Sequence, residues 1–86
     1  MDDIRWNNRA RKQIKLIPVK EREAIHDRID LLSTFPDVVG IDVKQLTGHQ
    51  YGYRLRVGRY RILFDFNNSI RVISIQEVKK RDERTY

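Results

Sequence analysis

Three arginines, Arg54, Arg56 and Arg61, lie at alternating positions on either side of a glycine in the second half of the chain. Strand side chains point alternately to two faces, and Gly58-Arg59 suits a two-residue type II′ turn, so this segment predicts a β-hairpin. The turn fixes the pairing of the two strands, with Arg56 directly opposite Arg61 and Arg54 on the same face.

Like charges that face each other across a sheet destabilise it, so Arg56 opposite Arg61 costs stability unless an anion lies between them. The guanidinium group offers a planar fork of donors that matches a phosphate. The pattern therefore indicates a phosphate-binding sheet face. A solvated basic strand surface without a ligand is the alternative that these residues leave open.

The other face of the hairpin is apolar and predicts a core. Its members are Tyr53, Leu55, Val57, Tyr60, Ile62 and Phe64. Asn67-Asn68 predicts a second turn, because asparagine tolerates positive φ, and a further strand over 69–78 would follow. The pairs expected from that turn are Ile62 with Ile73, Tyr60 with Ile75, and Arg61 with Ser74.

The first half of the chain predicts a short strand at 3–6 and two helices. Asn7 is a suitable N-cap for the first helix, Pro18 ends it, and the second helix should cover 20–33. Another short strand is expected at 41–46. We expect one domain over 1–86 of the α+β class, with two N-terminal helices on one face of a small, mainly antiparallel sheet. The basic face stays uncovered.

The composition limits the possible partners. The chain has 86 residues, 18 Lys and Arg against 12 Asp and Glu, and a net charge of +6, which favours an anionic partner. It has no cysteine, which excludes disulfides and is compatible with a reducing cytoplasm. No apolar run predicts a membrane span and no signal peptide is recognisable, so we expect a cytoplasmic protein without a membrane partner. No residue spacing suggests a metal site or a nucleotide loop, and we expect no cofactor.

These motifs together resemble the RelE branch of the RelE/ParE toxin superfamily. The segments that carry the resemblance are 53–64, Val72-Ile73-Ser74-Ile75, Lys80-Arg81 with Tyr86, Trp6-Asn7-Asn8-Arg9-Ala10, and Lys44-Gln45-Leu46-Thr47-Gly48, in which Gln45 is an extra residue. The resemblance implies the fold above and a ribosome-dependent endoribonuclease. Such an enzyme cuts messenger RNA in the ribosomal A site by metal-independent attack of a 2′-hydroxyl.

The resemblance also implies roles for individual residues. The expected catalytic residues are Arg54, Arg56, Arg61, Arg81 and Tyr86. Arg61 fits a phosphate-binding arginine, Arg81 an arginine near the leaving group, and Tyr86 a terminal tyrosine on which a base stacks. Further RNA contacts are expected from Lys44, Arg59, Lys79, Lys80 and Arg84.

The general base is the open question. Arg54 and Arg56 stand where the best-known members of the branch carry lysines, and an arginine effectively cannot lose its proton. We expect these two residues to act as electrostatic stabilisers instead. The remaining candidates for the base are Glu77, Lys79, Lys80 and His49.

The implied partners are a small acidic antitoxin and the 70S ribosome with its mRNA and rRNA. Operator DNA would be reached only indirectly, through the antitoxin. Two other functions remain open on the same fold: a ParE-like poison of DNA gyrase, and a catalytically degenerate RNA-binding module. The arginine cluster with its tail residues favours the nuclease, because a gyrase binder has no evident need for it.

Overall fold

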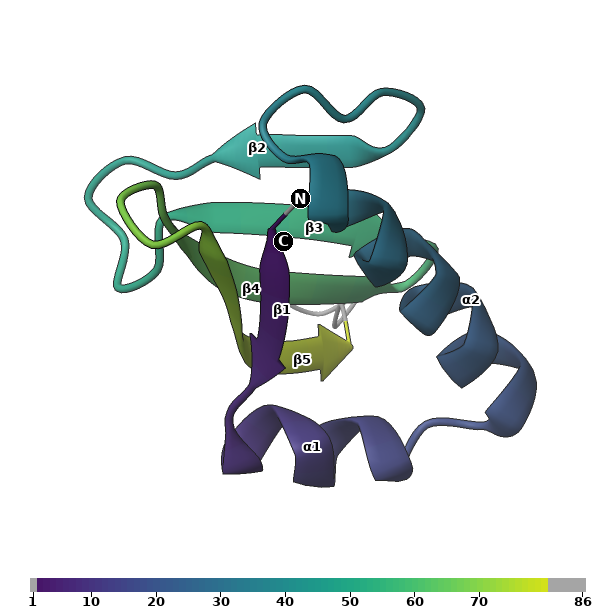
Figure 1. Ribbon diagram of the computed structural model, residues 1–86. Helices are drawn as coiled ribbons and strands as arrows, with labels where there is room; N and C mark the ends of the chain where they lie inside the picture. Colours follow the sequence, from purple (N-terminus) through teal and green to yellow (C-terminus); the bar gives the residue numbers. More distant parts are fainter. Residues whose placement is uncertain (1, 81–86) are drawn as a thin grey trace.

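The computed structural model describes residues 2–80 and consists of one sheet with its helices on one side (Figure 1). The elements are β1 Asp3–Trp6, α1 Asn8–Lys15, α2 Val19–Asp30, the 3-10 helix η1 Leu31–Thr34, β2 Asp42–Gln45, β3 Tyr53–Val57, β4 Tyr60–Asn67 and β5 Val72–Lys80. The strand order is β1-β5-β4-β3-β2, with only β1 and β5 parallel. The predicted α+β fold is confirmed.

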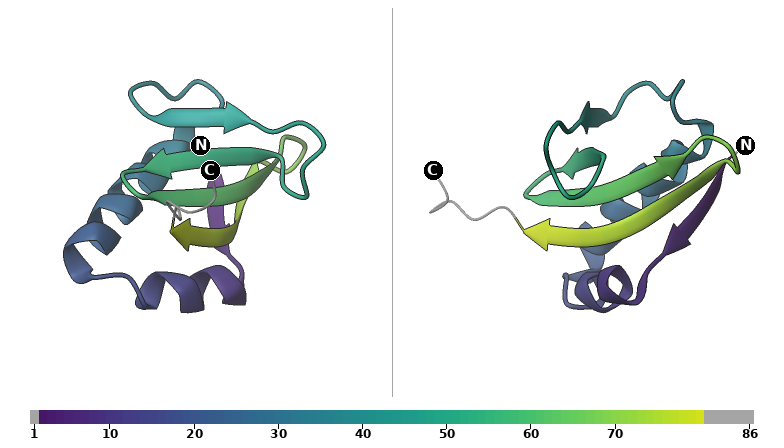
Figure 2. Two further views of the ribbon diagram at one scale, coloured as in Figure 1. Left: turned by 180° about the vertical axis from the view of Figure 1, so that it is seen from behind. Right: turned by 90° about the vertical axis from the view of Figure 1, so that its left-hand side faces the viewer.

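The first helix begins after Asn7 as predicted, whereas the second, expected over 20–33, is α2 Val19–Asp30 followed by η1, and each of α1 and α2 buries one side. The Asn7 side chain accepts a hydrogen bond from the Ala10 amide at 2.8 Å, which satisfies one free donor of the first turn of α1. Ala10 and Ile14 of α1, and Ile25 and Ile29 of α2, are buried against the sheet. Seen from behind in Figure 2, left, the strands lie in front of α2, so this side of the sheet carries no helix. Within residues 2–80, no helix has the length and apolar character needed to cross a membrane.

The central hairpin has the predicted register. Val57 pairs with Tyr60, and Arg56 pairs with Arg61. Gly58 has a φ of 56°, the left-handed value that the first central position of a type II′ turn requires. Leu55 is fully buried on the helix side, and the arginines therefore point to the uncovered face.

The predicted pairing of β4 with β5 is wrong. The turn covers residues 68–71 instead of Asn67-Asn68, so that Asn67 pairs with Val72. The pairs expected for Ile73, Ser74 and Ile75 are replaced by Phe66–Ile73, Asp65–Ser74, Phe64–Ile75, Ile62–Val78, Tyr60–Lys80 and Arg61–Lys79. Arg71 closes the wider turn with a φ of 55°, and its guanidinium donates to Asn68 Oδ1 at 2.9 Å and to the Phe35 carbonyl at 3.3 Å.

A β-bulge in the same strand pair reverses which side chains reach the core. The register shifts between Leu63 and Phe64, which leaves Gln76 as an extra residue of β5. Ile75 before the bulge and Val78 after it are both buried. Strict alternation from Ile75 would have directed Glu77 into the core, whereas the bulge directs it to the uncovered face.

Candidate active site

The uncovered sheet face carries two rows of residues that the strand pairings bring side by side. One row consists of Asp42, Arg56, Arg61 and Lys79, and the next of Lys44, Arg54, Leu63 and Glu77, each from β2, β3, β4 and β5 in turn. Three of the expected catalytic arginines thus lie together. Lys44 and Lys79, expected as RNA contacts, lie at the two ends of the cluster.

Asp42 is a carboxylate inside this cluster that the sequence did not single out. Its Oδ1 is 3.2 Å from Arg54 Nη2, and its Oδ2 is 4.0 Å from Arg56 Nε. It partly compensates the like charges of the hairpin from the β2 side. The sequence indicates that Asp42 lies in the expected strand 41–46, but it does not predict how that strand pairs with the hairpin.

Two guanidinium nitrogens on this face are buried without an acceptor among the described residues. They are Nη1 of Arg54 and Nε of Arg61. Buried donors in proteins are nearly always hydrogen-bonded, so such exceptions mark places where a ligand can supply the acceptor. An anion with several oxygens, such as a phosphate, fits donors on two neighbouring guanidinium groups.

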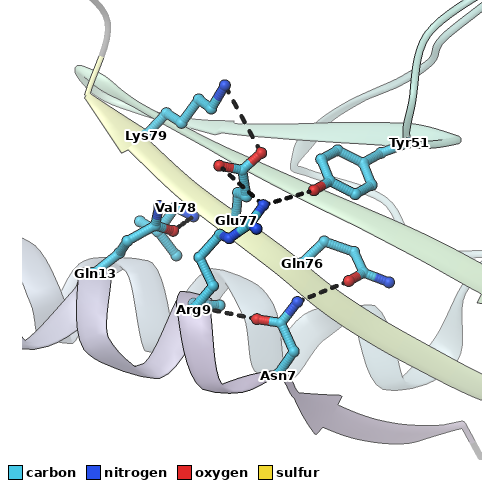
Figure 3. Close-up of polar contacts among 9 residues, drawn as sticks. Asn7, Arg9, Gln13, Tyr51, Gln76, Glu77, Val78 and Lys79 are labelled. Atoms are coloured by element: carbon cyan, nitrogen blue, oxygen red, sulfur yellow. Dashed lines mark hydrogen bonds and ion pairs between the residues drawn. The ribbon is translucent and has the colours of Figure 1, made fainter.

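The loop 46–52 is attached to the same face through Asp65 of β4. The Gly52 amide donates to Asp65 Oδ1 at 2.7 Å, and the loop is closed by the Leu46 amide donating to the Gly52 carbonyl at 2.8 Å. This places Tyr51 beside β5, where Arg9 of α1 donates to its hydroxyl at 3.4 Å (Figure 3).

Glu77 lies at the centre of that group of side chains. Its Oε1 is 4.0 Å from Arg9 Nη1, and its Oε2 is 3.7 Å from Lys79 Nζ. Burial raises the pKa of the Tyr51 hydroxyl, the negative charge of Glu77 raises it further, and Arg9 acts in the opposite direction. Tyr51 therefore stays protonated near neutral pH and remains a donor beside the carboxylate.

The other expected site residues lie apart from the arginine cluster or outside the described residues. His49 accepts a hydrogen bond from the Tyr51 amide on its Nδ1 at 3.1 Å, which leaves one ring nitrogen for other contacts. Arg59 is exposed at the tip of the hairpin. Lys80 pairs with Tyr60 and so faces the helix side of the sheet. Arg81, Arg84 and Tyr86 lie outside the residues that the structure describes.

The fold and its basic sheet face define a toxin of a type II toxin–antitoxin system, as comparison with known proteins shows. Residues 4–85 match the family model described as the ParE toxin of type II toxin–antitoxin systems, parDE. The chain belongs to this family, within the RelE/ParE superfamily that its sequence motifs resemble.

Several relatives carry the RelE name. The RelE1 protein of Methanocaldococcus jannaschii is 26% identical over 81 residues, which cover 93% of this chain and 90% of the relative. A chain of the RelE–RelB complex from Pyrococcus horikoshii matches with a TM-score of 0.80 and 25% identity, over 95% of this chain and 97% of that chain. The isolated RelE toxin of E. coli shares the fold, with a TM-score of 0.79 and 16% identity over 96% of this chain and 87% of that chain.

Proposed function

We propose that this toxin is a ribosome-dependent endoribonuclease that cleaves mRNA in the ribosomal A site. The observation that carries the proposal is the pair of buried guanidinium nitrogens without an acceptor, Arg54 Nη1 and Arg61 Nε, on a sheet face that no helix covers. A phosphodiester at this position would receive hydrogen bonds from both residues.

The proposed chemistry needs no metal. The 2′-hydroxyl of one nucleotide attacks the adjacent phosphorus in line, while Arg54 and Arg61 stabilise the charge that grows on the phosphate oxygens. Removing one preorganised donor of this kind costs about 2.7–4 kcal/mol of transition-state stabilisation. Arg56, 43% exposed and near Asp42, is assigned to RNA positioning and long-range attraction. Arg81 and Tyr86 keep their expected roles near the leaving group and the base.

The open shape of the site supports the proposed dependence on the ribosome. The arginines and lysines of the two rows lie on an open sheet face, and such a surface attracts the RNA backbone without fixing its geometry. In this proposal the decoding centre holds the message in the in-line conformation, and the toxin supplies the charges.

The partner of this toxin is proposed to be a small acidic antitoxin in the cytoplasm. The net charge of +6 and the clustered arginines favour an acidic partner that binds quickly and covers the basic face. Solved relatives with the RelE name include complexes with RelB antitoxins. Operator DNA would be bound only through the antitoxin.

Translation on purified ribosomes tests the proposal. Wild-type toxin should cut an mRNA in the A site of programmed ribosomes and leave the same RNA intact when it is free at equal concentration. Rapid cleavage of free RNA would contradict the ribosome dependence. Binding to ribosomes without any cut would instead support the degenerate RNA-binding module.

A second candidate function is poisoning of DNA gyrase, which the ParE description of the matching family favours. Two assays on the same preparation of toxin distinguish the two functions. A gyrase poison would inhibit supercoiling of plasmid DNA and leave ribosome-bound mRNA intact, whereas the proposed nuclease would do the reverse. The substitution Arg61→Ala should abolish mRNA cleavage if the toxin is the proposed nuclease, and should leave gyrase inhibition intact if the toxin is a gyrase poison.

A further inference from the structure

Three carboxylates lie on the uncovered face along β2, β4 and β5, and the contacts of Glu77 are longer than those of the other two. Asp42 pairs with Arg54 at 3.2 Å. Asp65 accepts hydrogen bonds from the Gly52 amide at 2.7 Å and from Gln76 Nε2 at 3.2 Å. The contacts of Glu77 with cations are 3.7 and 4.0 Å long, beyond hydrogen-bond distance. Glu77 therefore keeps oxygen lone pairs that can accept a proton.

Glu77 also lies at the correct place relative to the arginines. It faces Leu63 directly and Arg61 faces Lys79, so Glu77 and Arg61 are diagonal neighbours on one face. Diagonal neighbours of adjacent strands lie about 7–8 Å apart, within reach of long side chains. A phosphate held by Arg61 would leave the ribose next to it within reach of the Glu77 carboxylate.

Side chains from three elements surround the Glu77 carboxylate. Arg9 approaches one oxygen from α1 and Lys79 approaches the other along β5, while Tyr51 closes the site from the loop 46–52 (Figure 3). The side chain of Glu77 is only 12% exposed. A general base must be fixed within hydrogen-bond reach of the proton it removes, and contacts from three elements provide this.

We propose that Glu77 is the general base of the RNA cleavage reaction and that Tyr51 and Arg9 are its positioning residues. The inference rests on the proposed nuclease function and supplies the base that Arg54 and Arg56 cannot provide. The β-bulge at Gln76 is the structural cause, because it turns Glu77 from the core to the catalytic face.

The proposed step conserves atoms and charge. The Glu77 carboxylate takes the proton of the 2′-hydroxyl, and the oxygen forms a bond to phosphorus. The bond from phosphorus to the 5′-oxygen breaks, which gives a 2′,3′-cyclic phosphate and a 5′-hydroxyl. The leaving oxygen takes a proton from water, and Glu77 returns its proton to solvent, so no co-reactant is consumed.

The test is single-turnover cleavage on programmed ribosomes across pH, with four proteins. These are the wild type, Glu77→Gln, Glu77→Asp, and the matched control Glu23→Gln, which changes an exposed carboxylate on α2. Loss of a general base typically lowers a rate by about a hundred- to ten-thousandfold. We expect that loss for Glu77→Gln, together with a flattened rise of rate with pH. Glu77→Asp should keep the rise and part of the rate, and Glu23→Gln should behave as wild type.

To attribute the pH dependence of the rate to Glu77, the ionisable groups around Glu77 must be considered. They are Arg9 from α1, Lys79 on β5, Tyr51 from the loop, and Arg61 diagonally on β4. The imidazole of His49, whose ring centroid lies 6.1 Å from that of Tyr51, is a second candidate for the base near this group. The variant His49→Ala therefore belongs in the experiment. A rise with pH that disappears in His49→Ala and persists in Glu77→Gln would overturn the proposal.

The remaining outcomes are equally decisive. A Glu77→Gln protein that binds ribosomes and cuts at the wild-type rate with the wild-type pH profile would reduce Glu77 to an ion-pair partner of Arg9 and Lys79. If Glu77→Gln fails to fold, Glu77→Asp decides, and a wild-type rate there contradicts the proposal. Tyr51→Phe should slow cleavage and keep the rise with pH. If the wild type cuts nothing, the nuclease function itself fails.

Discussion

Arg56 and Arg61 face each other directly across the β3–β4 hairpin, and Asp42 reaches only the first of them. Two like charges in this position lower the stability of the hairpin. A ligand of opposite charge that binds between the two arginines would offset this loss of stability. The first prediction follows from this pair.

Arg61→Ala should damage catalysis far more than folding. Removing Arg61 relieves the repulsion with Arg56, so the melting temperature should stay equal or rise slightly. The rate on programmed ribosomes should fall by about a hundred- to a thousandfold if Arg61 acts as one preorganised donor. Arg61→Lys should recover part of the rate, because a point charge cannot reproduce the guanidinium fork.

The matched control for that experiment is Arg28→Ala, which removes an exposed arginine from the end of α2. It lowers the net charge by the same amount and should leave the cleavage rate unchanged. An Arg61→Ala protein that melts normally and cuts as fast as the control would remove Arg61 from the site.

Asp42→Asn should strengthen binding of single-stranded RNA. Asp42 Oδ1 forms an ion pair with Arg54 Nη2 at 3.2 Å and thus competes with a phosphate for the same guanidinium group. The carboxylate is 53% exposed, so its loss should change stability by no more than about 1 kcal/mol. Fluorescence anisotropy with a 2′-deoxy oligonucleotide, which cannot be cleaved, measures the affinity. Weaker binding by the variant would mean that Asp42 orients Arg54 and does not compete with the RNA.

Arg71→Met should destabilise the fold although Arg71 lies outside the catalytic rows. Its Nε is 2.8 Å from Asp2 Oδ1, and the Asp2 side chain is completely buried. Leaving a buried polar group without its partner costs about 1–3 kcal/mol. Chemical denaturation measures the change, and the double variant with Asp2→Asn should recover part of the loss. Equal stabilities of wild type and Arg71→Met would show that this ion pair does not hold the β4–β5 turn.

Tyr60→Phe should change how stability depends on alkaline pH. The hydroxyl of Tyr60 donates to Glu21 at 2.6 Å, and this hydrogen bond, followed by burial and the charge of Glu21, raises the pKa of Tyr60 above its usual value of 10.0. The folded state holds the Tyr60 proton more tightly than the unfolded state. The contribution of this proton to the free energy of unfolding is therefore complete below pH 10.0 and decreases as pH rises through the folded pKa. Thermal melts from neutral pH upward should show a steeper alkaline loss for wild type than for the variant. Parallel curves would contradict the assignment.

The sequence was sufficient where one local signal decides the structure. Gly58-Arg59 permits one tight turn, and the register of β3 with β4 follows from it, including Arg56 opposite Arg61. The start of α1 after Asn7 is equally local, and Pro18 lies between the end of α1 at Lys15 and the start of α2. Hydrophobic alternation then assigned the core face and left the arginines on the other.

The sequence was insufficient where distant residues decide the structure. Asn67-Asn68 suggests a two-residue turn, but Arg71 holds a wider one through contacts with Asp2 and Phe35. The bulge at Gln76, which brings Glu77 to the site, leaves no sign that alternation alone reveals. Asp42, Tyr51 and Arg9 come from three other elements, and their place near the arginines depends on the tertiary fold.

Cleavage of mRNA on the ribosome distinguishes the proposed nuclease from a gyrase poison and from an inactive RNA-binding module. Purified toxin is added to ribosomes programmed with a defined mRNA, and the position of the cut and its terminal groups are determined beside a reaction with free RNA. We expect a cut in the A-site codon with a 2′,3′-cyclic phosphate and a 5′-hydroxyl, and no cut of the free RNA. An intact message on toxin-bound ribosomes, with inhibition of gyrase by the same preparation, would contradict it.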